Sequence, residues 1–151
     1  FVEDAGTLQV TLTPSEAVAA GAKWRVAGEN AWRESGTTIT CAAGTYTVEF
    51  LDDLAGWYAQ TTSHVAAIQK DRMTTATGVY VSGKTWRLFA SGDNGTVTGS
   101  PLRTNYRDGS TVTLTATADD GYHFTGWSGD LTTTENPVAL TMDSSWRSFQ
   151  G

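Results

Sequence analysis

The stretch Ser110-Thr111-Val112-Thr113-Leu114-Thr115-Ala116-Thr117-Ala118 carries the clearest pattern in the chain. Its apolar residues recur at every second position, and hydroxyl-bearing residues fill the positions between them. Because successive side chains of a strand point to opposite faces, this alternation collects the apolar side chains on one face. Turn sequences bound the stretch, Asp108-Gly109 before it and Asp119-Asp120-Gly121 after it. The pattern therefore predicts a strand with one face on a core and the other in water.

The same two-residue period recurs on both sides of this stretch, whereas helical periodicity is nearly absent. The other expected strands are residues 7–13, 22–26, 37–41, 45–51, 63–68, 73–81, 86–90, 96–98, 122–127, 138–142 and 146–149. The dipeptide Asn94-Gly95 predicts a tight hairpin turn. Ser82-Gly83 marks the expected boundary between two parts. The sequence thus predicts an all-β, or mostly β, chain of two small tandem domains, residues 1–82 and 84–151.

Composition and charge limit the kinds of partner. The 151 residues carry a formal net charge of -6, with scattered arginines and three lysines, so a nucleic-acid partner is not expected. No apolar run reaches the roughly 18 residues of a spanning helix, so membrane insertion is not expected either. Cys41 is the single cysteine, which leaves no internal disulfide and no paired thiols for zinc. The chain begins at Phe1 rather than Met, and we expect it to be a piece of a longer protein.

The two halves share a weak internal rhythm. In each, a strand is followed by an Asp-Asp turn and then by Gly-Trp, as a comparison of residues 44–57 with residues 109–127 shows. The intervals differ, so the rhythm indicates similar small modules rather than an identical repeat.

Residues from about 88 to 149 resemble the internalin-type B-repeat of bacterial surface proteins. The matching elements are Gly95-Thr96-Val97-Thr98, Ser100-Pro101, Tyr106, Gly109, Val112-Thr113-Leu114-Thr115-Ala116, Gly121-Tyr122, Phe124, Gly126-Trp127-Ser128-Gly129-Asp130, Asn136-Pro137-Val138, Leu140, Met142-Asp143 and Phe149. The resemblance implies a small β-grasp-like domain of the kind strung in tandem on adhesins and secreted proteins. It brings no catalytic residues. The segment 144–149 departs from the family pattern, because Trp146 stands where a small or charged turn residue is common.

The N-terminal half is similar to PEGA-like bacterial surface domains. The similarity rests on Gly6-Thr7-Leu8, Gly21-Ala22-Lys23-Trp24-Arg25-Val26, Trp32, Ser35-Gly36, Gly44-Thr45-Tyr46-Thr47-Val48-Glu49-Phe50 and Gly56-Trp57, although the namesake four-residue motif is missing. It implies a small β-sandwich.

The aromatic residues divide into core and surface candidates. Trp24, Tyr122, Phe124 and Trp127 are expected in the cores, because small β domains need bulky apolar side chains to be stable. Trp32, Trp57 and Trp146 are the candidates for contact with a ligand, such as stacking on a sugar ring.

Other candidate sites have an ordinary structural explanation. His64 and His123 are expected to be strand histidines, and no catalytic motif accompanies them. Asp52-Asp53 and Asp119-Asp120 offer oxygen ligands for calcium, but they lack the spacing of a calcium loop and suit turns equally well. Asn94-Gly95-Thr96 matches a glycosylation sequon that a turn also explains. We therefore expect no catalytic residues, no cofactor and no metal, while a calcium ion or a Lys–Asn crosslink remains an open alternative.

These observations favour a non-catalytic structural, display or adhesion module of a secreted or cell-surface bacterial protein. Its expected partners are other protein modules or subunits of the same assembly, and its expected location is extracellular or on the cell surface. Two alternatives stay open. One is a subunit of an extracellular filament, with residues 1–6 added as a strand to a neighbour. The other is a carbohydrate-binding module with a glycan partner.

Overall fold

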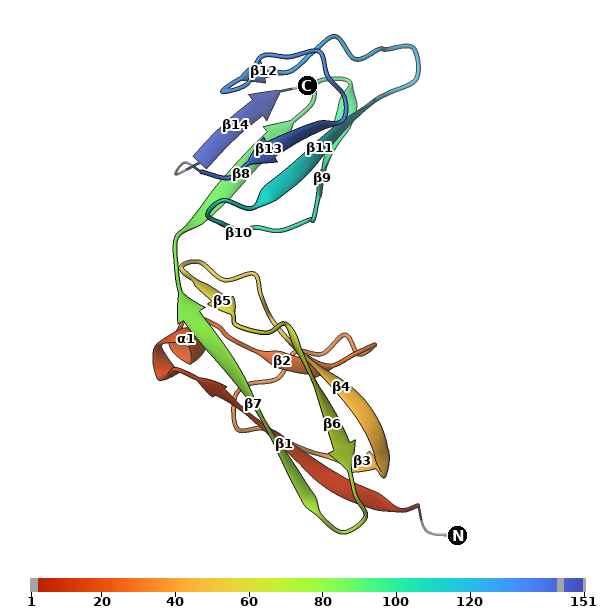
Figure 1. Cartoon of the computed structure of the whole chain (residues 1–151). Coiled ribbons are helices and arrows are strands. Elements are labelled where there is room, and N and C mark those ends of the chain that lie inside the picture. The colour runs from red at the N-terminus through yellow and green to blue at the C-terminus, as the bar shows by residue number, and fades with distance from the viewer. Residues whose placement is uncertain (1–2, 144–145, 151) are drawn as a thin grey trace. The chain divides into compact units, whose positions relative to one another are not determined.

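The computed structural model of the chain describes residues 3–143 and 146–150, and the described chain is built almost entirely of strands (Figure 1). It divides into two compact units, Phe1–Ser82 and Gly83–Gly151, which we call unit 1 and unit 2. The predicted all-β class and the two small tandem domains are confirmed. No helix among the described residues is long and apolar enough to cross a membrane.

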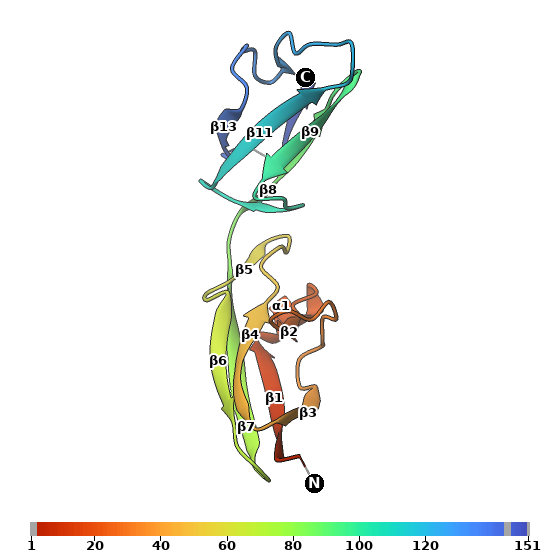
Figure 2. The ribbon, with the colours of Figure 1, turned by 90° about the vertical axis from the view of Figure 1, so that its right-hand side faces the viewer.

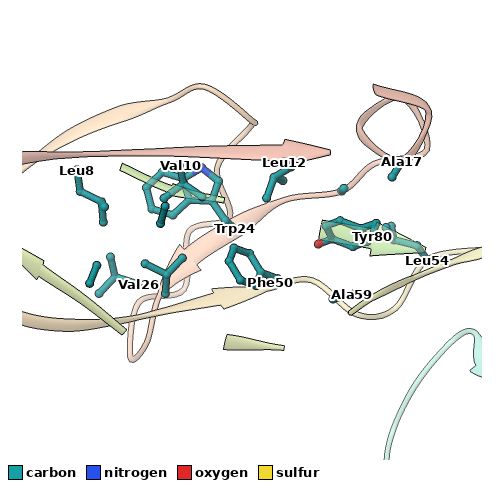
Figure 3. Packing of buried hydrophobic residues seen from close by; sticks show 14 of the residues in the cluster. Leu8, Val10, Leu12, Ala17, Trp24, Val26, Phe50, Leu54, Ala59 and Tyr80 are labelled. Atoms are coloured by element: carbon teal, nitrogen blue, oxygen red, sulfur yellow. The ribbon is translucent and has the colours of Figure 1, made fainter. Parts of the chain in front are cut away.

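Unit 1 is a sandwich of two sheets. The first sheet has the strand order β3-β1-β7-β5, with the bounds β1 Ala5–Thr13, β3 Thr38–Ala42, β5 Trp57–Ala59 and β7 Met73–Ser82. The second has the order β2-β4-β6, with the bounds β2 Trp24–Val26, β4 Gly44–Phe50 and β6 Ser63–Ile68. Alternating side chains of both sheets meet in one core, where Leu8, Val10 and Leu12 of β1 face Trp24 and Phe50 (Figure 3).

One short helix was not expected in unit 1. Helix α1, Ser15–Ala19, follows directly after Pro14 ends β1, and it buries Ala17 in the core. Five residues make little more than one helical turn, which is too short to show a helical period in the sequence.

Unit 2 also consists of two sheets. The first has the order β10-β8-β14-β12, with the bounds β8 Thr85–Ser91, β10 Tyr106–Arg107, β12 Ser128–Gly129 and β14 Trp146–Gln150. The second has the order β13-β11-β9, with the bounds β9 Gly95–Ser100, β11 Thr111–Ala118 and β13 Val138–Thr141, and β9 lies beside β11 in Figure 2. The alternation that predicts β11 is confirmed in the first half of the strand, because Val112 and Leu114 are buried in the second core.

The first and last strands of each unit pair in parallel. In unit 1, β1 pairs with β7 from Thr7↔Met73 to Thr13↔Val79. In unit 2, β8 pairs with β14 from Arg87↔Trp146 to Ser91↔Gln150, and the two strands lie side by side in Figure 1. Each unit is therefore entered at one end of a parallel pair and left at the other end.

Two local expectations are wrong. The turn at Asn94-Gly95 joins β8 to β9, but these strands belong to different sheets, so the turn connects two layers instead of closing a hairpin. Residues 122–126 form no strand, because the chain leaves the sheet after Ala118, at the end of β11, and within 122–127 only Trp127 makes an isolated bridge, to Thr133.

The N-terminal segment predicted as a free donor strand is bound within unit 1 from Asp4 onward. The carbonyl of Asp4 accepts a hydrogen bond from the Ala43 N–H at 2.7 Å, and Ala5 pairs with Ala42 of β3. Ala5 also accepts from the Asp71 N–H at 2.9 Å. Residues 1–2 of that prediction lie outside the described part of the chain.

Candidate ligand-contact surfaces

Trp24 and Trp127 hold equivalent loops in the two units. Both are buried in the cores as predicted, at 0% and 2% exposure. Each forms an isolated bridge to a residue further along the chain, Trp24 to Arg33 and Trp127 to Thr133. Each indole N–H then donates to a glutamate carbonyl one or two residues beyond that bridge, at 3.0 Å to Glu34 and at 2.8 Å to Glu135. In both units the tryptophan precedes a loop, and its buried indole bonds the far end of the same loop.

This shared arrangement differs from the rhythm seen in the sequence. The sequence comparison aligns Trp57 with Trp127, whereas the hydrogen bonds make Trp24 the counterpart of Trp127. The sequence did not reveal this correspondence, because the residues that bridge to the two tryptophans are of different types, Arg33 in unit 1 and Thr133 in unit 2.

Trp32 lies in the loop between β2 and β3 and is half-buried. The guanidinium of Arg25 lies over its ring, 4.5 Å from the centroid, and the Nε of Arg25 forms an ion pair with Glu49 at 2.7 Å. A cation–π contact of this kind holds the ring against the sheet and covers one of its faces. Only the opposite face of Trp32 is left for a flat ligand such as a sugar.

Trp57 opens β5 and packs half-buried against the core of unit 1. It pairs with Ser82 across the ladder, so it stands in the sheet that does not contain β2. The backbone of Trp146 begins β14 in unit 2, while its side chain lies outside the described part of the structure. The three predicted contact aromatics therefore lie in three separate parts of the chain, a loop and the strand β5 in unit 1 and the strand β14 in unit 2.

Tyr122 is on the surface, and its prediction as a core residue is wrong. Its side chain is 58% exposed, because β11 ends at Ala118 and a turn then leads into a loop. In this turn Gly121 has a φ of +88° and the Tyr122 N–H donates to the Asp119 carbonyl at 3.0 Å. The alternation of a strand therefore does not continue through this segment. Phe124 is half-buried and meets Trp127 edge to face, with the ring centroids 5.3 Å apart, so it covers the core as expected.

Tyr122 stands at a shallow depression of unit 2 with a volume of about 220 Å³. Three segments line it: the turn and first residues of β9 at 92–97, the end of β11 at 116–118, and the loop 122–125. Tyr122, His123 and Asp93 are among the lining residues, and side chains of these types can stack on a sugar and bond its hydroxyls, although the Asp93 carboxylate already accepts a hydrogen bond from the Gln150 side chain. Sequence reasoning missed this place, because its parts are up to 33 positions apart and Tyr122 was assigned to the core.

The residues considered for chemistry belong to different units and elements and have ordinary structural surroundings. His64 is exposed in β6 of unit 1, and His123 is exposed in the loop after β11 of unit 2. The Asp52 carboxylate accepts the Ala59 N–H at 2.8 Å, seven residues further along the chain. Across residues 3–143 and 146–150, no three metal-binding side chains of the His, Cys, Asp or Glu type gather in one place.

Cys41 lies half-buried in β3. Burial raises the pKa of its thiol, and the carboxylate of Glu29 raises this pKa further, which outweighs the opposing effect of Arg33. The thiolate is the reactive form of cysteine, so these surroundings favour an unreactive thiol.

The fold defines a class of protein, namely a tandem pair of small all-β domains whose first and last strands run in parallel. Within this class, residues 88–150 match the family described as the divergent InlB B-repeat domain. This match supports the resemblance found in the C-terminal half, and the PEGA-like resemblance of the N-terminal half stays a prediction.

No curated protein matches the chain. Among solved structures, it is similar to one described as the Bacillus anthracis TIE protein, at 12% sequence identity and a TM-score of 0.42. The similarity covers 98% of this chain and 33% of that chain, so the present chain spans about a third of its length.

Proposed function

We propose that the chain is a non-catalytic structural module, for display or adhesion, of a secreted or cell-surface bacterial protein. One observation carries the proposal: in both units the first and last strands are parallel neighbours. A parallel pair sends the chain in at one end of a unit and out at the other. In unit 1 the ten residues of β7 separate these ends by roughly 30 Å, at about 3.3 Å per residue.

Such connectivity suits domains joined in series, because each unit adds its length to the path of the chain. The match of residues 88–150 to a B-repeat family supports a surface location. The formal net charge of -6 is compatible with protein partners of the same assembly.

The location is tested on the bacterium that makes the protein. Antibodies raised against the folded chain should label intact cells or detect the chain in the medium, and a protease added to intact cells should remove the cell-bound signal. An antibody against a cytoplasmic enzyme serves as the control for leakage. Signal that appears only after lysis would overturn the proposal.

A second candidate function is glycan binding at the depression beside Tyr122. It is favoured by the 58% exposure of this aromatic ring at a concave surface that also holds His123 and Asp93. Screening the chain on a glycan array should then give binding that Tyr122→Ala removes. The matched variant Trp32→Ala tests the surface expected from the sequence. Absence of binding, or binding that survives both substitutions, would count against these two surfaces.

A further inference from the structure

The parallel pairing also determines how each unit meets a pulling force. In unit 1, a force along the chain pulls β1 toward its N-terminal end and β7 toward its C-terminal end. Because β1 and β7 are parallel, these directions are opposite along one shared ladder of seven residue pairs, Thr7↔Met73 to Thr13↔Val79. The hydrogen bonds of the ladder cross between the strands, so sliding strains all of them together. Unit 1 is therefore loaded in shear.

The end at which the force reaches β1 is closely bound. Thr7 donates its N–H to the Arg72 carbonyl at 2.9 Å, and the Ala5 carbonyl accepts the Asp71 N–H at 2.9 Å. Gly6 between them is in very close backbone contact, since a Cβ there would lie 2.1 Å from the Gln69 oxygen and 2.8 Å from the Arg72 oxygen. Outside the ladder, Lys70 and Asp4 form an ion pair at 2.7 Å. These contacts take the load first.

Side-chain packing resists the same displacement. Leu8, Val10 and Leu12 of β1 are buried at 0%, 0% and 4% exposure (Figure 3). On its other side, β1 pairs with β3 from Ala5↔Ala42 to Gln9↔Thr38. For β1 to slide, three apolar side chains must leave a close-packed core while two ladders break.

Unit 2 repeats the geometry on a shorter ladder. The force enters at the N-terminal end of β8 and leaves at the C-terminal end of β14, and these strands pair in parallel over the five positions from Arg87↔Trp146 to Ser91↔Gln150. We propose that both units are shear-loaded clamps that let the chain bear tension, and that unit 2 yields at the lower force. This function goes beyond display or adhesion and does not depend on where the protein is located.

Single-molecule pulling on the full chain tests the proposal by changing only the points of attachment. In a Cys41→Ser background, the variant Glu3→Cys/Lys84→Cys loads unit 1 along the β1–β7 pair. The variant Ala55→Cys/Lys84→Cys loads the same unit across the antiparallel β5–β7 pair, where Trp57↔Ser82 and then Ala59↔Tyr80 separate one after another. All three attachment sites are exposed, so the substitutions spare the core.

We expect the rupture force of unit 1 to be several-fold higher for the first attachment than for the second at the same pulling speed. Equal forces would overturn the clamp. A third variant, Lys84→Cys/Gln150→Cys, loads unit 2 and should rupture below unit 1, whereas a higher force would overturn the proposed order. The first two variants load the same unit in two directions, so a difference between their rupture forces reports the direction of load. Circular dichroism of all three variants checks that they are folded. A surface protein whose units rupture at low force would overturn this proposal alone. A cytoplasmic protein whose units rupture at high force would overturn the proposed surface function alone.

Discussion

Gly78 in β7 shows how a single hydrogen atom in place of a side chain sets the packing of unit 1. It lies opposite Leu12 in the parallel ladder, and a Cβ at this position would lie 2.7 Å from Leu12 Cδ2 and 2.7 Å from the Phe50 ring. Gly78→Ala should lower the free energy of unfolding by about 1–3 kcal/mol, because the core is already filled. Urea titration measures the loss. Gly44→Ala is the control, since its Cβ would lie 3.8 Å from Tyr46 in ordinary contact, and similar stabilities of the two variants would contradict this account.

Tyr80 makes the stability of unit 1 depend on alkaline pH. Its hydroxyl donates to the Leu51 carbonyl at 2.8 Å, and burial, with a smaller contribution from the Asp52 carboxylate, raises its pKa well above the ordinary value of roughly 10. Above roughly pH 10 the unfolded chain releases the Tyr80 proton, while the folded chain still keeps it. The unfolded state then binds fewer protons, so the free energy of unfolding falls as the pH rises. The stabilisation that the protonated Tyr80 hydroxyl gives to unit 1 is fully present below about pH 10.

We therefore expect the free energy of unfolding to decline above about pH 10 in the original protein and to decline less in Tyr80→Phe. At neutral pH this variant should lose about 1 kcal/mol, because the Leu51 carbonyl loses its donor. Urea titrations at a series of pH values give both quantities. Identical slopes in the two proteins would show that Tyr80 does not cause the decline.

At this scale the sequence predicts burial where a residue lies within a regular strand. Trp24 of β2 is a core residue as expected. Tyr122 is not, because the rule of alternation holds only while the backbone stays extended and paired, and the pairing of β11 ends at Ala118, before the turn at Gly121. The depression beside Tyr122 could not be foreseen for the same reason.

At the scale of elements, Asn136 extends the edge of β11 beyond its partner strand. β13 pairs with β11 up to Val138↔Leu114, and the Asn136 side chain then bonds Ala116 twice, its Nδ2 donating at 2.8 Å and its Oδ1 accepting at 2.9 Å. The amide thus takes the place of a backbone partner. Asn136→Ala should cost about 1–3 kcal/mol, because both polar groups of Ala116 lose their partner.

Urea unfolding of Asn136→Ala, followed by fluorescence, measures this cost. The matched control is Asn30→Ala, which removes the same side chain from an exposed position in the loop after β2. A loss no larger than in the control would mean that water replaces the amide at Ala116 without cost.

Long strands could be located from the sequence, whereas the two-residue strands could not. Residues 63–68 and 110–118 were expected as strands, and β6 and β11 are Ser63–Ile68 and Thr111–Ala118. The strands β10 and β12 have two residues each, which is one period of the alternation at most. Such strands arise from contacts with neighbours that are distant in sequence, so local pattern cannot specify them.

At the scale of the whole molecule, the parallel pairing of first and last strands was beyond sequence reasoning. Thr7 and Met73 are 66 positions apart, and their pairing depends on how two sheets close over one core. The alternation indicates which face of each strand is buried, but it does not indicate which neighbour lies beside it or in which direction. The proposed mechanical role depends on this global feature alone.

The described core residues fall into two clusters without a common member, one drawn from residues 8–80 and the other from residues 106–142. We therefore expect the units to open independently, since sites without shared packing partners act additively. Hydrogen exchange of the full chain, resolved by peptide, tests this with the two substitutions above. Gly78→Ala should speed exchange in β1 and β7 and leave β11 and β13 unchanged, and Asn136→Ala should do the reverse. Faster exchange in both units from either substitution would show that the chain unfolds as one cooperative body, and a pulling force would then rupture both clamps in a single event.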